Sequence, residues 1–327
     1  MYIQIVYPGR LPALKYGGTE RVIWYLGKEL VKMGYRVSYL AGRGSYCDFG
    51  NITEINPDIP VENQTDPNAD ILHFQRELSV PVNRPYIVTI HGNIRHTMNL
   101  DPNTVFVSRD HACRHNSMSY VYNGLDWDDY GRDISLDKSR SYYHFLGKAA
   151  WRVKNVKGAI NIVKKLPDGK LYVLGGTRLN MKMGFRFTTT PRASFFGMVG
   201  GEEKNSLLNG SKGLIFPVRW SEPFGLAITE SLYFGCPVFG TPYGSLPEIV
   251  TPDVGFLSNS ESELARHIKE TPYNTRRCHE YACDMFNSRL MAEAYIKRYE
   301  KVLNGETLNP EPPRTLNVIK GHLPWYK

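Results

Sequence analysis

The chain has 327 residues, of which 42% are hydrophobic and 22% charged, a balance typical of folded globular domains and unlike that of disordered or fibrous chains. At roughly 100–200 residues per domain, this length predicts two domains. Lysine and arginine outnumber aspartate and glutamate by 40 to 32, so the net charge of +8 suits an anionic partner such as a nucleotide phosphate or a phospholipid surface. No nucleic-acid recognition motif accompanies this charge, and we expect no nucleic-acid partner.

No apolar run in the sequence is long enough to cross a bilayer, and the first residues resemble a strand rather than an export signal. We therefore expect a cytoplasmic protein. The five cysteines lack a CxxC pair and the companion ligands of a zinc site, so they are interpreted as plain thiols: Cys47, Cys113, Cys236, Cys278 and Cys283.

The first third of the chain alternates strand-like runs with helical or turn segments, which is typical of a parallel sheet covered by helices. Strands are predicted at residues 2–7, 36–41, 70–74, 86–91, 104–108 and 119–122. Residues 19–34 carry Val22, Leu26 and Leu30 at helical spacing and end at Gly34, which predicts an amphipathic helix.

A polar stretch at residues 126–141 separates this series from a second one of the same kind. The second series predicts strands at 142–146, 171–174, 194–197, 213–217 and 237–240, and helices at 156–166, 201–209, 225–235, 260–270, 275–286 and 288–303. We expect an α/β protein with an N-terminal domain at residues 1–135 and a C-terminal domain at 136–287. Residues 288–327 should form a helix and tail that pack back towards the N-terminal domain.

Two loops of these predicted domains carry groups suited to an elongated anionic ligand. Gly17 and Gly18 precede a helix, where bare backbone amides favour an anion, although a simple tight turn would use the same residues. Glu222 and Glu230 are eight residues apart around a helix start, so both carboxylates can reach one ligand. A pair of structural salt bridges is the alternative interpretation.

The segment from Glu222 to Glu230 resembles the E-x7-E motif of retaining glycosyltransferases of family 4, which have the GT-B fold. The likeness extends in chain order through residues 17–22, 89–92, 122–126, 145–148, 157–158, 173–176, 196–199, 235–238 and 244–250. It implies two Rossmann-like, doubly wound domains facing across a cleft.

The resemblance also implies roles for individual residues. Glu222 would contact hydroxyls of the donor sugar and Glu230 those of the ribose, while His91 would face the donor sugar from the other domain. The backbone amides of Phe224, Gly225 and Leu226 would bind the sugar or diphosphate, and Gly17 and Gly18 are expected on the donor side.

A cationic loop departs from the family pattern, in which an arginine, four intervening residues and then Lys-Gly follow the first strand of the second domain. It holds four cations, Lys148, Arg152, Lys154 and Lys157, and the spacing leaves open which of them bind the diphosphate. Arg152 and Lys157 fit the spacing of the family's arginine and lysine. Alternatively, Lys148 fits the position directly after Gly147, and Lys154, followed by Asn155, would then be the second cation of the pair. A solvated surface loop is the other interpretation.

The resemblance implies a retaining, metal-independent transfer of a hexosyl-type group from a nucleotide-sugar donor to a hydroxyl acceptor. The acceptor would be a sugar or a lipid-linked hydroxyl, and the reaction would belong to bacterial-type glycan, lipopolysaccharide or glycolipid assembly. Asp126 and Asp128 spell DxD, a metal motif of another glycosyltransferase architecture, but they lie in the predicted linker, and we expect neither a metal nor another cofactor. A GT-B nucleotide-sugar epimerase or hydrolase, or a non-catalytic nucleotide-binding subunit, is the alternative function.

Residues 177–187 mix three cations, Arg178, Lys182 and Arg186, with leucine, methionine and phenylalanine. This mixture is typical of segments that attach to anionic membranes, which would make the protein peripheral at the inner face of a membrane. A hairpin packed on the second domain is the alternative.

Overall fold

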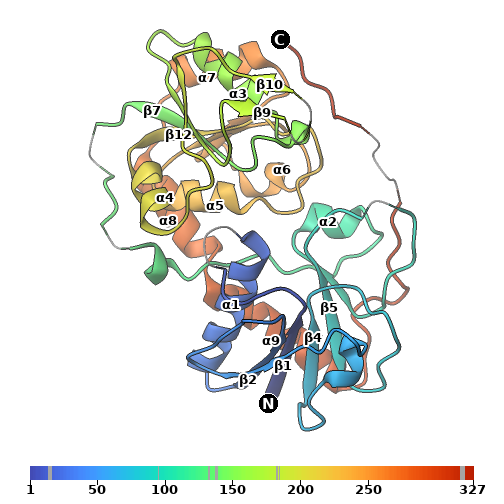
Figure 1. The fold of residues 1–327 in the computed structure, drawn as a ribbon. Helices are drawn as coiled ribbons and strands as arrows, with labels where there is room; N and C mark the ends of the chain where they lie inside the picture. The colour runs from blue at the N-terminus through green and yellow to red at the C-terminus, as the bar shows by residue number, and fades with distance from the viewer. Residues whose placement is uncertain are drawn as a thin grey trace. The chain divides into compact units, whose positions relative to one another are not determined.

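A computed structural model describes residues 1–13, 17–94, 96–131, 133–136, 139–181, 183, 185–316 and 321–327 of the chain. The chain forms two compact units, Met1–Asp126 with Phe286–Val318 and Trp127–Met285 with Ile319–Lys327 (Figure 1). The chain thus enters the second unit after Asp126, whereas the sequence places the boundary after residue 135. The end of the tail belongs to the second unit and not, as expected, to the first.

The first unit is built on a parallel sheet in the order β3-β2-β1-β4-β5-β6. Its strands are β1 (Tyr2–Tyr7), β2 (Arg36–Ala41), β3 (Asn51–Glu54), β4 (Ile71–Phe74), β5 (Tyr86–Ile90) and β6 (Thr104–Phe106). Its helices are α1 (Gly18–Lys32), α2 (Arg109–Cys113) and α9 (Ser288–Leu303), with a 3-10 turn η1 (Val61–Gln64).

Helix α1 follows from its sequence, because Val22, Ile23, Leu26 and Leu30 fall on one face and are all buried. The chain leaves the helix through Gly34, whose φ of +88° lies in the left-handed region that favours glycine. The predicted helix is therefore confirmed, but it runs from Gly18 to Lys32 instead of from Thr19 to Gly34.

A buried polar network joins α9 to the first sheet. The His73 ring lies 2.8 Å from both the Tyr299 hydroxyl and the Thr89 hydroxyl, and Thr89 lies 3.1 Å from the Tyr295 hydroxyl. Both tyrosines come from α9, so residues more than two hundred positions apart in the chain share one core. The expected return of the C-terminal helix to the N-terminal sheet is observed within this unit.

The second unit repeats the plan with a parallel sheet in the order β11-β8-β7-β12-β13-β14. Its strands are β7 (Tyr142–Leu146), β8 (Leu171–Leu174), β11 (Ala193–Phe195), β12 (Ser211–Phe216), β13 (Val238–Gly240) and β14 (Gly255–Leu257), and a separate antiparallel hairpin pairs β9 (Leu179–Asn180) with β10 (Arg186–Phe187). Its helices are α3 (Val156–Lys164), α4 (Gly201–Asn209), α5 (Leu226–Tyr233), α6 (Leu246–Ile249), α7 (Glu261–Glu270) and α8 (Thr275–Met285), with 3-10 turns η2 (Trp127–Tyr130) and η3 (Arg152–Lys154).

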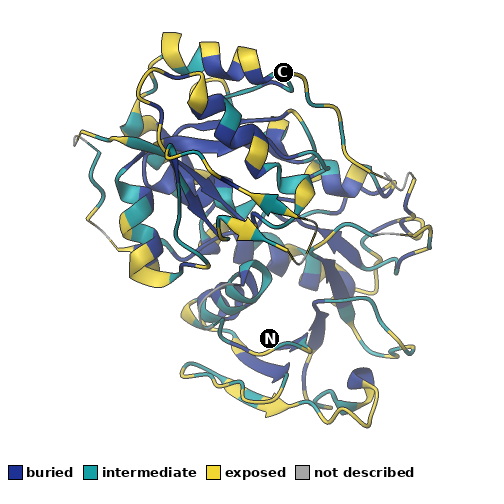
Figure 2. Cartoon of the chain, turned by 45° about the horizontal axis from the view of Figure 1, so that its top comes forward, coloured by how far each residue is buried: buried dark blue, intermediate teal, exposed yellow. Residues whose placement is uncertain are grey.

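The two sheets have the same doubly wound strand order, with the central strands buried and the exposed residues concentrated on outer helices and loops (Figure 2). This confirms the predicted α/β class. In such sheets ligands bind at the carboxyl ends of the strands, where the strand order reverses. In the second unit that point lies between β7 and β12, so the loops that follow these two strands are the first place to look for a site.

The loops after β7 and β8 touch backbone to backbone. Gly175 has a φ of +129°, and a Cβ atom there would lie 2.1 Å from the carbonyl oxygen of Gly147. The Ala149 amide donates to the Gly175 carbonyl at 2.8 Å. A glycine at position 175 is therefore required to hold the start of the cationic loop against the sheet.

Some local predictions were wrong. Residues 119–122 form no strand, and Tyr120 makes only an isolated bridge to Phe106. The predicted strand at 104–108 stops at Phe106 because Ser108 turns to cap α2, with its hydroxyl accepting from the His111 amide at 3.1 Å. Strands β3 and β14 and helices α2 and α6 were not predicted, because each is too short to show a clear period.

Within the part of the chain that the structure describes, no helix combines the length and the apolar character needed to cross a membrane.

Candidate functional site

The loop after β12 carries Glu222, which is buried with 6% of its surface exposed. One oxygen of its carboxylate, Oε2, accepts hydrogen bonds from Lys154 Nζ at 2.6 Å and from the indole Nε1 of Trp220 at 2.8 Å. The Lys154 ammonium also lies 4.8 Å from the ring centre of Trp220. A cation, a carboxylate and an indole thus meet beyond the carboxyl end of the central strand.

The backbone of Glu222 is held by a second loop. Gly244 has a φ of +65°, and a Cβ atom there would lie 2.2 Å from the Glu222 amide nitrogen. The next residue, Ser245, donates its amide to the Glu222 carbonyl at 2.9 Å and its hydroxyl to the Phe224 carbonyl at 2.7 Å. The glycine therefore permits a close approach that fixes the position of the carboxylate.

Helix α5 begins immediately after this loop. Gly225 precedes it with a φ of +87°, and no side chain in the described part of the chain caps its N-terminus. Backbone amides at the start of a helix can bind an anion, so the predicted role of the amides at Phe224, Gly225 and Leu226 stays a prediction compatible with this geometry.

The four predicted cations have different surroundings in the structure, and Lys154 lies next to a left-handed turn. Asn155, a non-glycine residue, adopts a left-handed conformation with φ of +54° and caps α3, its Oδ1 accepting from the Gly158 amide at 3.1 Å. The preceding 3-10 turn η3 brings Lys154 to Glu222. Asparagine is one of the few residues other than glycine that enter this backbone region readily, so the turn can form without a glycine at position 155.

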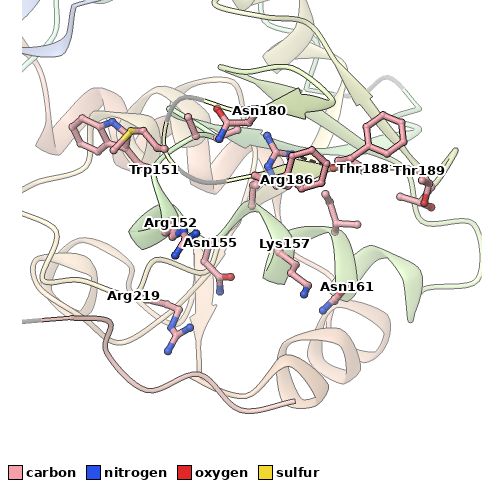
Figure 3. Close-up of a pocket in the computed structure, with 18 of the residues that line it drawn as sticks. Trp151, Arg152, Asn155, Lys157, Asn161, Asn180, Arg186, Thr188, Thr189 and Arg219 are labelled. Carbon is pink, nitrogen blue, oxygen red and sulfur yellow. Dashed lines mark hydrogen bonds between the residues drawn. The ribbon is translucent and has the colours of Figure 1, made fainter.

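The other three cations lie elsewhere on the loop. Lys148 is exposed, and its ammonium lies 5.1 Å from the ring centre of Trp151. Arg152 and Lys157 line a separate pocket of about 590 Å³ beside α3 (Figure 3). Of the four cations, Lys154 is the one that the structure places against Glu222, and which of them bind the diphosphate stays a prediction.

Glu230 lies inside the second unit with 2% of its surface exposed. Its Oε1 accepts from the Tyr130 hydroxyl at 2.8 Å and forms an ion pair with Lys204, whose ammonium lies 4.9 Å from the Tyr130 ring centre. Glu222 and Glu230 thus both take part in ion pairs, as the alternative interpretation of a pair of structural salt bridges expects. Sequence reasoning did not find Lys204 or Tyr130, because α4 and the linker give no local sign of a partner on α5.

His91 follows β5 in the first unit. Its Nε2 donates to Gln75 Oε1 at 2.7 Å, and burial lowers the pKa of His91 to about 4. The ring is therefore neutral near pH 7 and suits a hydrogen-bonding role better than that of a proton donor.

Gly17 and Gly18 also belong to the first unit, where Gly17 precedes α1 and Gly18 is its first residue. Glu20 lies over this helix start, since a Cβ atom on Gly17 would lie 2.5 Å from Glu20 Oε2. The Tyr7 hydroxyl donates to Glu20 Oε1 at 2.9 Å. An incoming anion would have to compete with this carboxylate. Tyr16, which precedes the pair, lies outside the described residues.

Asp126, the first aspartate of the DxD sequence, is paired with two lysines. Asp126 belongs to the first unit and lies 2.8 Å from Lys28 Nζ and 3.2 Å from Lys32 Nζ. Burial opposes its ionisation, but these two lysines keep the pKa of Asp126 below its usual value. Trp127 instead stacks on Tyr233 with ring centres 4.3 Å apart. The described residues include no group of three or more metal-ligating side chains of the His, Cys, Asp and Glu types.

The buried histidines predict a pH dependence of stability. Burial lowers the pKa of His73, His91 and His111 in the first unit, so the native state binds fewer protons than the unfolded chain below about pH 6.5. The stabilising effect of neutral rings is complete above that pH and is lost as the pH falls. We expect the unfolding free energy at pH 5 to drop by up to about 2 kcal/mol per histidine, measured by urea unfolding at pH 5 and 7.5.

A substitution at His91 isolates one part of this pH dependence. The His91→Gln variant keeps a hydrogen-bonding nitrogen without a titratable ring, so its unfolding free energy should depend less on pH than that of the unaltered chain. An identical pH dependence in both proteins would show that His91 does not titrate as proposed.

Comparison with known proteins finds a family match that falls within the second unit. Residues 130–282, just under half of the chain, match the family model of glycosyl transferases group 1. The matched region contains the cationic loop, Glu222, Glu230 and the two partners of Glu230 named above, Tyr130 and Lys204.

A curated relative, an uncharacterized 41.2 kDa protein in the cps region of Klebsiella pneumoniae, is 23% identical over 203 residues. The match covers 57% of this chain and 55% of that protein, so the chain matches about half the length of this relative.

Solved structures match almost the whole chain. AviGT4, a glycosyltransferase involved in avilamycin A biosynthesis, is 21% identical with a TM-score of 0.75, covering 94% of this chain and 99% of its own. Sucrose-phosphate synthase from Thermosynechococcus elongatus is 14% identical with a TM-score of 0.69, and the match covers 93% of this chain and 100% of the synthase chain. Anabaena HepE, solved in complex with UDP-glucose, is 14% identical with a TM-score of 0.64, and the match covers 92% of this chain and 98% of the HepE chain. At these identities the likeness is one of fold, and it confirms the predicted GT-B class.

Proposed function

We propose that this chain is a retaining glycosyltransferase that moves a sugar from a nucleotide-sugar donor to a hydroxyl acceptor. The observation that carries the proposal is the contact between Lys154 and Glu222 beside the uncapped start of α5. It lies at the switch point of the second sheet, within the segment that matches glycosyl transferases group 1.

The donor diphosphate would bind at the start of α5. The amides around Gly225 and Leu226 would supply hydrogen-bond donors, and Lys154 would supply a positive charge. The Lys154 ammonium is held in place by Glu222, whose carboxylate also accepts a hydrogen bond from Trp220. Lys148, exposed on the same loop, is the second candidate cation. HepE was solved with UDP-glucose, which supports a nucleotide-sugar ligand for this fold.

The sugar would bind against Glu222, whose second carboxylate oxygen would accept hydrogen bonds from sugar hydroxyls. The bond from the anomeric carbon to the diphosphate breaks, and the acceptor oxygen bonds to that carbon on the same face. The acceptor proton passes to the departing diphosphate, so no enzymic base is required. Catalysis then depends on stabilising the negative charge on the leaving group and on positioning the acceptor.

Several finer parts of the proposal depend on the family resemblance. His91, Gly17 and Gly18 of the first unit would contact the nucleotide-sugar donor. Glu230 would accept hydrogen bonds from the ribose hydroxyls while it keeps its ion pair with Lys204. We propose that no metal is needed, because lysine and helix amides supply the positive charge. The acceptor would be a sugar or lipid-linked hydroxyl in glycan, lipopolysaccharide or glycolipid assembly, in the cytoplasm or at the inner face of a membrane, a setting consistent with the cps region of the Klebsiella relative.

A direct test uses the purified chain with a panel of nucleoside diphosphates and nucleotide sugars. The matching donor should raise the melting temperature, since a ligand at about a hundred times its Kd stabilises the native state by about 2.7 kcal/mol. With acceptor present, a new glycoside should form at the same rate with and without EDTA. Abolition by EDTA with rescue by manganese would overturn the metal-free mechanism.

The same experiment separates the alternative functions. Conversion or hydrolysis of the donor without any acceptor would favour an epimerase or a hydrolase. Nucleotide binding with no turnover under any condition would favour a non-catalytic subunit. Configuration at the new glycosidic bond, measured by NMR coupling constants, tests whether the reaction is retaining.

A further inference from the structure

The positive charge of this protein is concentrated in one segment. Residues 148–192 contain eleven lysines and arginines and a single aspartate, a net charge of +10. Because the whole chain carries +8, the remaining residues together carry a charge of −2. The segment forms the cationic loop, α3, β8 and the β9–β10 hairpin, all within the second unit. This region is therefore the most basic part of the chain and the first candidate for attraction to an anionic surface.

The hairpin in the same segment exposes a row of large apolar side chains. Leu179, Met181, Met183, Phe185 and Phe187 are each between 48% and 76% exposed. Scattered exposed apolar residues are common on folded proteins, but five within nine residues form a patch of the kind that marks an interaction surface. Residues 179–187 thus include the antiparallel hairpin that the alternative interpretation expects, but each of these five side chains leaves about half or more of its surface exposed.

Beside the hairpin lies the pocket of about 590 Å³, lined by α3 on one side and by β10 and the following threonines on the other (Figure 3). Arg152, Lys157, Lys164, Arg186 and Arg219 line it together with His322. Its described lining residues include no aspartate or glutamate. A basic pocket next to an exposed apolar hairpin combines two features that interfacial membrane binding requires.

Three of these cations are available for a ligand. Arg152, Lys157 and Lys164 make neither an ion pair nor a side-chain hydrogen bond within the described part of the chain. Lys157 and Lys164 are seven residues apart on α3, so about two helical turns place them on one face. Three unpaired cations around one hollow attract an anion without the need to break a native contact.

We propose that this face of the second unit binds an anionic phospholipid membrane, with the pocket taking a lipid phosphate and the apolar hairpin side chains entering the interface. Charge complementarity favours this occupant over a protein surface, because a bilayer offers negative charge and an apolar layer side by side. The proposal does not depend on the glycosyltransferase function, since it concerns binding without donor or acceptor.

The structure also changes which cations the test should alter. Arg178 donates to the carbonyls of Thr188, Thr190 and Ala193, and Arg186 donates to the carbonyl of Thr177, so both hold the hairpin together. Lys182 lies outside the described residues. Neutralising Arg178 or Arg186, as the sequence alone suggests, would disturb the hairpin itself, whereas Lys157 and Lys164 can be changed without loss of a described contact.

The experiment is co-sedimentation of the full chain with phosphatidylcholine vesicles, with and without phosphatidylglycerol, at low and high salt. Binding should require phosphatidylglycerol and weaken with salt. The Lys157→Gln and Lys164→Gln variants should each bind about fivefold more weakly, and the Phe185→Ser, Phe187→Ser double variant at least about tenfold more weakly.

Matched controls lie on the first unit. Lys297→Gln removes an exposed lysine and Met118→Ser removes an exposed methionine, and both should bind vesicles like the unaltered chain. Unchanged circular dichroism would show that each variant is folded.

Three outcomes would overturn the proposal. The first is equal recovery in the supernatant with and without anionic vesicles at low salt. The second is vesicle binding that the lysine and phenylalanine variants leave unchanged, which would place the membrane surface elsewhere. The third is a dimer in solution that the Phe185→Ser, Phe187→Ser variant dissociates, which would show that a second copy covers the hairpin.

Discussion

Replacing Glu222 with glutamine should lower kcat by about 100- to 1000-fold, the scale seen when one preorganised polar group of an active site is lost. The carboxylate accepts from Lys154 and Trp220 through one oxygen, which fixes the direction of the lysine ammonium. Glutamine keeps the volume but loses the charge, so Lys154 is no longer held beside the proposed diphosphate. The measurement is the steady-state rate of glycoside formation with the donor found in the binding panel.

Lys154→Met should cause a loss of similar size, larger than that caused by Lys157→Met, because Lys154 meets Glu222 whereas Lys157 lines the separate pocket. The Glu263→Gln variant is the matched control, since Glu263 accepts a hydrogen bond from Ser258 at the start of α7 and has no proposed role in the reaction. Full activity in folded Glu222→Gln and Lys154→Met proteins would refute this site.

Replacing Glu230 with glutamine should reduce the unfolding free energy by about 3–5 kcal/mol, because it leaves a buried lysine without its counter-charge. Lys204 is 7% exposed and Glu230 is 2% exposed, so water does little to screen the remaining charge. The Tyr130 hydroxyl would keep a hydrogen-bond partner in the amide oxygen, so the loss comes chiefly from the charge. Urea unfolding of both proteins at pH 7.5 measures it.

A double variant separates the structural role of Glu230 from its proposed contact with the ribose. Lys204→Met together with Glu230→Gln removes both charges, and most of the stability should return. If the carboxylate also binds ribose hydroxyls, the donor KM should stay raised in this stable double variant. A donor KM like that of the unaltered chain would restrict Glu230 to the ion pair with Lys204.

Local sequence determined much of the framework. Strands β1, β2, β7 and β8 and helices α4 and α9 begin and end where the sequence predicts, because each has either a dense apolar run or a clear helical period bounded by a glycine or a polar cap. The loops that carry Glu222 and the cations were found for the same reason, since they follow strands that the apolar pattern identifies.

Contacts between distant residues were decided only by the tertiary structure. Counting along the chain could not show which of the four cations contacts Glu222. That contact depends on the left-handed turn at Asn155 and on the loop after β12, since Glu222 lies 68 residues after Lys154. The ion pair of Glu230 depends on Lys204, a residue on another helix.

The β9–β10 hairpin shows the same division. Its sequence contains apolar and basic residues side by side, which is compatible with a hairpin packed on the second domain or with a segment that attaches to a membrane. Whether an apolar side chain is buried depends on what the rest of the chain places over it, and that information is not local. Composition and periodicity thus determined the two doubly wound domains, while the pairing of charges and the exposure of the hairpin depended on the folded chain, because both arise from contacts between residues far apart in sequence.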